Sequence, residues 1–175
     1  PLHRWRARQQ LQELTAADLR FTLAETTDFL QQTMQLTLTM ADIATLEKRT
    51  EGWAAGLQMA ALSLRHNGST VDQISGDDRY IVDYLLAEVL AQQPADIREF
   101  LLHTAVLRRL TAPLCQHLYP HASAQATLEQ LASQNLFTLP LDNQRRWHRY
   151  HHLFAELLQN QLQQQQPARI PSLHE

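Results

Sequence analysis

The sequence contains very little cysteine and glycine. Cys115 is the only cysteine, which excludes an intrachain disulfide framework and a zinc site built on cysteine pairs. The four glycines are scattered, and neither G-x-x-x-x-G-K-[ST] nor G-x-G-x-x-G occurs, so these residues cannot form a phosphate-cradling loop of their own. We therefore expect no ATP hydrolysis by these residues alone.

Other absences narrow the function further. The motifs H-E-x-x-H and G-x-S-x-G do not occur, so the chain offers no signature of a zinc protease or a serine hydrolase. No run of about 18 apolar residues is present, and the polar N-terminus lacks the apolar core of a secretory signal. We expect a non-enzymatic, cytoplasmic protein without membrane contact. A chain that begins at Pro1 and ends in "IPSLHE" is expected to be a piece of a larger protein.

The charge balance gives no overall attraction to nucleic acid. The formal net charge is −3 and the pI about 6.3, while 44% of the residues are hydrophobic and 19% are charged. These values are typical of a globular domain and untypical of a disordered or strongly basic chain. Lys48 is the only lysine among the 15 basic residues.

Helix-favouring residues dominate, so the chain is expected to be mostly α. Thr22 and Glu25 have the spacing of a capping box, and Thr39 is a second candidate cap. Spacing near Leu11 indicates a short strand. Helices are expected at 23–34, from Thr39 to Gly52, at 53–64, after Asp77 or Asp78, at 94–107, at 112–119, at 124–134 and at 151–163.

The periodicity changes near the end of the chain. "LFTLPL" and "RRWHRYH" flank Asp142, Asn143 and Gln144, which predicts a β-hairpin. Three helices, a hairpin and a closing helix are the order of a winged-helix unit. The predicted fold is therefore mostly α, with a small helical subdomain followed by a winged-helix-like subdomain with one β-hairpin.

A stand-alone DNA-binding winged helix is one alternative, and a helical protein-interaction module is another. No lysine or arginine occurs from Leu110 to Gln144, the span that holds the helix expected to enter the major groove. A DNA-reading helix normally has basic residues around it that neutralise phosphates. Arg145, Arg146 and Arg149 could contact phosphates as a wing, but the recognition helix has no cations. The sequence therefore argues against DNA binding by this unit.

The histidines allow several interpretations. His148, His151 and His152 are close in sequence, but no further ligands are evident for the four-coordinate site that zinc prefers. His117 and His121 are separated by Pro120, which interrupts any helix that could place both on one face. His151 and His152 could cap the last helix, or the N-terminus of that helix could face a bound phosphate.

Six stretches in order resemble one family. They are "WRARQQLQELTAADLRFT" from Trp5 to Thr22, "RTEGWAAGLQMAALSLR", "YIVDYLLAEVL", "FLLHTAVLRRLTAPLC", "NLFTLPLD" and "RYHHLFAELL". Together they resemble the MalT-type LuxR transcriptional activators, which are large signal-transduction ATPases of the STAND class. In that family ADP holds a closed resting form, and ATP with an inducer opens it, after which the protein oligomerises and activates transcription.

The resemblance implies a domain organisation. Residues 1–21 would end the nucleotide-binding domain and residues 22–68 would form a helical subdomain. Residues 69–76 would be a linker, residues 77–166 the winged-helix-like subdomain, and residues 167–175 a linker toward a sensor domain. ATP or ADP would bind in the parent protein, with none held tightly by this chain alone. The expected partners are the nucleotide-binding and sensor domains of the same chain, with possible self-association, and DNA only through a helix-turn-helix that is absent here.

The resemblance also implies site residues. The family's Met-His-Asp-like motif corresponds to Tyr150-His151-His152, so His151 resembles the residue that reaches the β-phosphate of ADP. His152 stands where relatives have aspartate. The Gly-Leu-Pro motif near the adenine corresponds to Gly56-Leu57-Gln58, which makes Gly56 and Leu57 candidate pocket residues, with glutamine in place of the proline. No metal site is implied.

Overall fold

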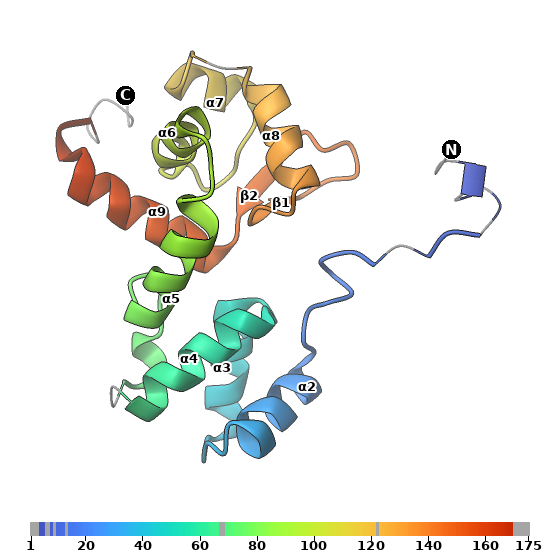
Figure 1. Cartoon of the computed structure of the whole chain (residues 1–175), viewed down its shortest axis with the longest axis vertical. Helices are drawn as coiled ribbons and strands as arrows, with labels where there is room; N and C mark the ends of the chain where they lie inside the picture. Colours follow the sequence, from blue (N-terminus) through green and yellow to red (C-terminus); the bar gives the residue numbers. More distant parts are fainter. Residues whose placement is uncertain are drawn as a thin grey trace.

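The computed structural model describes residues 4–5, 8, 10–12, 14–66, 69–121 and 123–169. One group of helices lies within residues 14–66. It consists of α2 (Leu23–Asp28), its π-helical continuation η1 (Phe29–Thr33), α3 (Met40–Thr50) and α4 (Ala54–His66). These helices lie together at one end of the molecule (Figure 1).

The second group forms the other end of the molecule. It contains α6 (Ala95–Thr104), α7 (Ala112–Leu118), α8 (Ala124–Ser133), the strands β1 (Thr138–Pro140) and β2 (His148–Tyr150), α9 (His152–Gln165) and the turn η4 (Pro167–Arg169). Between the groups run η2 (Val71–Gln73), α5 (Arg79–Tyr84) and its π-helical continuation η3 (Leu85–Leu90). The predicted fold class, a mostly α chain with a helical part followed by a winged-helix-like part, is confirmed.

Local capping sets the helix starts. The Thr22 hydroxyl accepts the Glu25 N–H at 3.3 Å, and the Glu25 carboxylate accepts the Thr22 N–H at 2.8 Å. Thr39 and Asp42 repeat this arrangement at the start of α3, with distances of 3.2 and 3.1 Å. Each pair satisfies two backbone N–H groups that a helix start leaves free. Both predicted caps are confirmed.

The chain reverses sharply after α3. Glu51 has a φ of 51° and Gly52 a φ of 70°, so two successive residues adopt the left-handed conformation. A Cβ at Gly52 would stand 2.5 Å from the Phe21 carbonyl oxygen, which leaves room only for glycine. This turn directs Glu51 away from α3 and toward the winged-helix-like part.

The hairpin is short and antiparallel. Thr138 pairs with Tyr150 and Pro140 with His148, and an isolated bridge joins Leu110 to His148. The predicted hairpin is confirmed. Because β2 leads directly into α9, its register fixes where the last helix begins.

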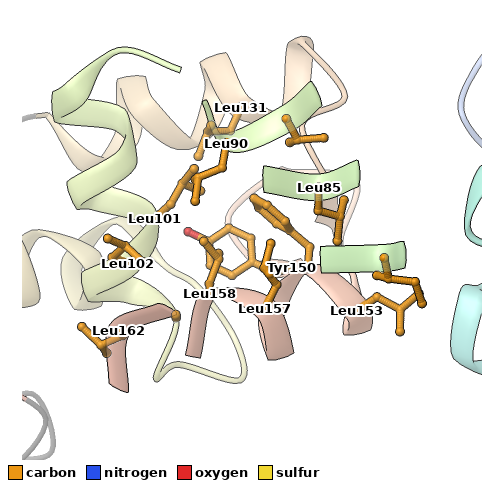
Figure 2. Close-up of a cluster of buried hydrophobic side chains, with 14 of the residues drawn as sticks. Leu85, Leu90, Leu101, Leu102, Leu131, Tyr150, Leu153, Leu157, Leu158 and Leu162 are labelled. Carbon is orange, nitrogen blue, oxygen red and sulfur yellow. The ribbon is translucent and has the colours of Figure 1, made fainter. Parts of the chain in front are cut away.

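The core of the second group centres on Tyr150. Its ring lies among leucines from η3, α6, α8 and α9, as Figure 2 shows. The buried residues of α9 recur at the spacing of one helix face and are Leu153, Phe154, Leu157, Leu158 and Leu162. Burying this face holds α9, and with it the residues just before the helix, in a fixed position.

The structure differs in detail from some of the expectations drawn from the sequence. The strand expected near Leu11 is wrong, because residues 10–12 and 14–15 have no strand partner in the part of the chain that the structure describes. A strand without a partner leaves its backbone groups unpaired. Asp78, rather than Asp77, caps α5 by accepting the Tyr80 N–H at 3.1 Å. Among the described residues, no helix is long and apolar enough to cross a membrane.

Candidate functional site

The C-terminus of α3 meets the turn between β2 and α9. Thr50 and Glu51 come from α3, and Arg149, His151 and His152 come from the end of the hairpin and the start of α9. We call these five residues the junction, because they join the two groups of helices.

Glu51 is the charged centre of the junction. Arg149 donates one guanidinium hydrogen bond to each Glu51 carboxylate oxygen, both at 2.7 Å. The backbone N–H of His152, the first residue of α9, donates to the same carboxylate at 3.2 Å, and Arg20 lies 3.6 Å away. The Glu51 side chain is only 8% exposed. A carboxylate from α3 thus occupies the N-terminus of α9, where the helix favours an anion.

The ionisation of Glu51 follows from these contacts. Burial alone would raise the pKa of Glu51, but the Arg149 hydrogen bonds, the charge that His151 carries when it is protonated, the Arg149 charge and the His152 N–H together lower it to about 2. Glu51 is therefore an anion throughout the ordinary pH range.

His151 lies beside this ion pair. Its Nε2 lies 2.8 Å from the Thr50 carbonyl oxygen, and its backbone N–H donates to the Phe137 carbonyl at 2.8 Å. The residue is 4% exposed, and its Nδ1 is buried without a hydrogen-bond partner among the described residues. Although His151 is the N-cap residue of α9, its side chain makes no capping hydrogen bond. The side chain therefore joins α3 to α9 and does not cap the helix.

Burial lowers the pKa of His151 below its usual value. The Glu51 carboxylate and the Thr50 carbonyl act in the opposite direction, while Arg20 and His152 add to the lowering. The ring is thus neutral at pH 7 in this structure.

A cavity of about 330 Å³ opens beside His151. Three aromatic side chains, Trp53, Tyr84 and Phe137, line it together with His151, and Arg20 adds a positive charge. The ring centroids of Trp53 and Phe137 lie 6.0 and 5.7 Å from that of His151. We call this space the His151 cavity; its aromatic walls suit a planar group, and its polar residues suit an anion.

The other predicted site residues, Gly56 and Leu57, are buried in α4. Gly56 is buried in α4, and a Cβ there would stand 2.4 Å from the Trp53 ring. Leu57 is fully buried and packs in the core. Neither residue lines the His151 cavity as the structure defines it. Their assignment to nucleotide binding stays a prediction, and the structure gives Gly56 a local role in letting the Trp53 ring approach α4 closely.

A larger cavity of about 550 Å³ also borders the start of α9. Lys48, Arg49, His152 and Glu156 line it. Arg49 already donates to the Ile74 carbonyl, and Glu156 already accepts the Gly76 N–H at 2.6 Å. Because Arg49 and Glu156 have partners within the fold and no aromatic side chain lines this cavity except the His152 ring, we place the candidate site at the His151 cavity despite its smaller volume.

No catalytic or metal-binding cluster accompanies the cavity. Within the described residues, no three histidine, cysteine or carboxylate side chains converge as metal ligands. His148, which is close to His151 in sequence, is buried in β2 and neither of its ring nitrogens has a partner there. The lining of the His151 cavity suits a planar or anionic group, but it offers no paired nucleophile and base.

The winged-helix surface also bears on DNA binding. The exposed residues of α8 include Gln125 and Glu129, which hydrogen-bond each other at 2.6 Å, and the helix carries no cation. Arg145 and Arg146 are exposed at the hairpin. The suggestion that Arg149 belongs to a phosphate-contacting wing does not hold, because Arg149 is paired with Glu51.

Sequence reasoning singled out His151 but not its partners in the fold. Glu51 is notable in the sequence only as part of a helix stop, and Arg149 only as one of several arginines before the last helix. They are 98 positions apart, so no local pattern could have paired them.

Comparisons with known proteins agree with this fold. Residues 86–170 match the family model described as the MalT winged helix domain. The chain is 34% identical over 174 residues to the HTH-type transcriptional regulator MalT of Yersinia enterocolitica, which covers 97% of this chain and 19% of that protein. It is also 33% identical over 177 residues to the serine/threonine-protein kinase PknK of Mycobacterium tuberculosis, covering 99% of this chain and 16% of the kinase. The resemblance predicted from the sequence is confirmed, and the chain spans less than a fifth of the length of these relatives.

Proposed function

Residues 86–170 are a MalT winged helix domain, and from this premise we propose that the chain is the regulatory region of an ATP-dependent LuxR/MalT-type transcriptional activator. In this proposal it acts as a lid and latch that couples the bound nucleotide, ADP or ATP, to opening and oligomerisation. The bound nucleotide is supplied by a nucleotide-binding domain of the same protein.

The two kinds of relative support a switching role. One is a transcriptional regulator and the other a protein kinase, yet both are similar to almost the whole of this chain. A region shared by proteins with different outputs is poorly explained as the output itself. It is better explained as a module that controls when an output domain acts.

The single observation that carries the nucleotide part is the unpartnered Nδ1 of His151. A buried polar atom without a partner is costly, so such atoms are rare in folded proteins. His151 also lines a cavity with three aromatic walls and one arginine. A nucleotide, with a planar base and an anionic phosphate, has the chemistry that this lining would accept.

The proposal extends to the domain boundaries. We propose that residues 1–21 belong to the nucleotide-binding domain, 22–68 to a helical subdomain, 69–76 to a linker, 77–166 to the winged-helix-like subdomain and 167–175 to a linker toward a sensor domain. DNA contact would be made by a separate helix-turn-helix. In keeping with this, α8 presents no cation.

The test is His151→Ala in the protein as its gene encodes it. We expect ADP affinity to fall about tenfold to a hundredfold, because one charge-assisted hydrogen bond to phosphate contributes on the order of 1.5–3 kcal/mol. Transcription without inducer should rise. His117→Ala, on the exposed face of α7, is the matched control and should change neither quantity.

Three outcomes would contradict the proposal, and the last two would each favour an alternative. One is unchanged ADP affinity with full inducer dependence in the His151→Ala variant. Another is tight, salt-sensitive binding of duplex DNA by the 175-residue chain, which would favour a stand-alone DNA-binding winged helix. A helical interaction module would be favoured if the full protein bound no nucleotide.

A further inference from the structure

The Thr50 carbonyl determines which nitrogen of His151 carries the proton. A carbonyl oxygen can only accept a hydrogen bond, so the 2.8 Å contact requires a proton on Nε2. In the neutral ring the other nitrogen, Nδ1, then carries a lone pair and is an acceptor. The fold therefore selects one of the two neutral tautomers.

This tautomer conflicts with direct binding of a phosphate. Phosphate oxygens are acceptors at neutral pH, and two acceptors cannot share a hydrogen bond. Nε2 is already committed to Thr50, so Nδ1 is the only ring nitrogen left for a ligand. For Nδ1 to donate to a phosphate oxygen, the ring must first gain a proton and become an imidazolium.

We propose that the Thr50 carbonyl and the Glu51 carboxylate are positioning groups for His151, and that a nucleotide phosphate binds at Nδ1 together with the uptake of one proton from solvent. This inference rests on the proposed function, since it concerns the same nucleotide site. The proton adds to the Nδ1 lone pair, and no covalent bond between heavy atoms is made or broken.

The charges around His151 explain why the ring changes state only with a ligand. Glu51, at the end of α3, favours the imidazolium. Arg20, before α2, and His152, in α9, oppose it, as does burial. Arg149 of β2 neutralises part of the Glu51 charge through its two hydrogen bonds. Without a ligand these influences leave the ring neutral, and a phosphate anion in the cavity adds the negative charge that stabilises the imidazolium.

The aromatic walls of the His151 cavity strengthen the link between phosphate binding and protonation of His151. Trp53 and Phe137 lie edge-on to His151, and neither offers a charge that could replace the phosphate. Because the ring is enclosed by these side chains and held by Thr50, it cannot turn Nε2 toward a ligand without losing its bond to α3. Protonation is thus the route to phosphate binding that keeps the junction intact.

The first measurement uses the 175-residue chain with nitrogen-15-labelled histidine. We expect His151 to be a neutral ring with the proton on Nε2, assigned by the loss of its signals in His151→Ala. A proton on Nδ1 in the free chain would overturn the proposal, because the Thr50 contact could not then exist.

The second measurement uses the full protein as encoded, titrated with ADP. In the complex both His151 nitrogens should be protonated, and calorimetry in buffers of different ionisation enthalpy should show about one more proton taken up than by His151→Ala. Subtracting the proton uptake of His151→Ala cancels the protons that ADP itself exchanges with the buffer. Above pH 6.5, ADP affinity should fall by up to about tenfold per pH unit relative to that variant.

Glu51→Gln separates positioning from simple structural support. It keeps the shape and removes the charge, so the pH range of tight ADP binding should move to lower pH while the Nε2 tautomer is retained. Glu88 is an exposed carboxylate of η3, so Glu88→Gln is the matched control. It should change neither the pH range of tight ADP binding nor the tautomer of His151.

The outcomes distinguish this inference from the proposed function. If His151→Ala weakens ADP binding but the bound ring stays neutral, the proton coupling is wrong and the nucleotide site stands. If ADP affinity does not depend on His151 at all, the proposed function fails, and the tautomer measurement on the free chain still decides the role of Thr50.

Discussion

Arg149 and Glu51 are joined by two parallel hydrogen bonds of 2.7 Å, although 98 positions separate them in the chain. The pair connects β2 to the end of α3, and it lies next to the hydrogen bond between His151 and Thr50. The two groups of helices are therefore held together at the residues that are expected to respond to nucleotide. Opening of the junction would disturb the candidate site.

The first prediction concerns the stability that this pair provides. Arg149→Ala leaves the Glu51 carboxylate buried without its main partner, so the free energy of unfolding should fall by about 3 kcal/mol. Chemical denaturation of the 175-residue chain measures this. Arg79→Ala is the control, because the Arg79–Asp83 pair is exposed and 3.8 Å apart, and its loss should cost less than about 0.5 kcal/mol. Equal losses of unfolding free energy in the two variants would contradict a stabilising role for the Arg149–Glu51 pair.

Acid should weaken the fold through Glu51. The pKa of Glu51 is lowered from 4.5 to about 2 in the folded chain, so the folded state binds fewer protons than the unfolded state between these values. The stabilisation is complete above pH 4.5 and is lost as pH falls toward 2. It amounts to about 3 kcal/mol. Glu51→Gln should lack this part of the pH dependence, whereas Glu88→Gln should retain it in denaturation curves.

A separate pH dependence should come from His148. Burial lowers its pKa, and neither ring nitrogen has a partner among the described residues. The unfolded chain therefore binds a proton more readily, so stability should be greatest above about pH 6.5 and decrease below it. His148→Leu should reduce this loss while changing stability little at pH 7, since it removes two unpaired buried nitrogens. His151 contributes in the same direction and should account for the slope that remains.

The hydrogen bond between Tyr150 and Thr104 should show an asymmetry. The two hydroxyl oxygens are buried and 2.7 Å apart, and the Thr104 hydroxyl donates to the Phe100 carbonyl at 2.7 Å. Tyr150 therefore donates to Thr104. Tyr150→Phe should cost about 1 kcal/mol, because Thr104 keeps its bond to Phe100. Thr104→Ala should cost more, about 1–3 kcal/mol, because it leaves the tyrosine hydroxyl buried without an acceptor. Thermal and urea unfolding of both variants would reveal the order, and the reverse order would contradict the assigned donor.

Local features of the sequence were sufficient for most of the fold. The caps at Thr22 and Thr39, the helix stop near Gly52 and the hairpin around Asp142 each depend on residues within a few positions of one another. The strand expected near Leu11 failed because a strand requires a distant partner, and local spacing carries no information about one.

The candidate site was predictable only in part. The resemblance pointed to His151, and the structure gives that residue a buried ring and a cavity. The resemblance gave no indication that Glu51 would occupy the start of α9, or that Trp53, Tyr84 and Phe137 would form the walls of the His151 cavity. Gly56 was singled out for a ligand, whereas its close neighbour in the fold is the ring of Trp53.

By itself the sequence determined approximately where most helices and the hairpin of this protein lie, since capping, turn formation and helical periodicity act between near neighbours in the chain. Only the tertiary structure decided that Arg149 pairs with Glu51 and that His151 donates to Thr50. The partners in those contacts lie about a hundred positions apart, and burial of the apolar face of α9 brings them together. Once they meet out of water, the Thr50 carbonyl, which can only accept a hydrogen bond, gives His151 its tautomer.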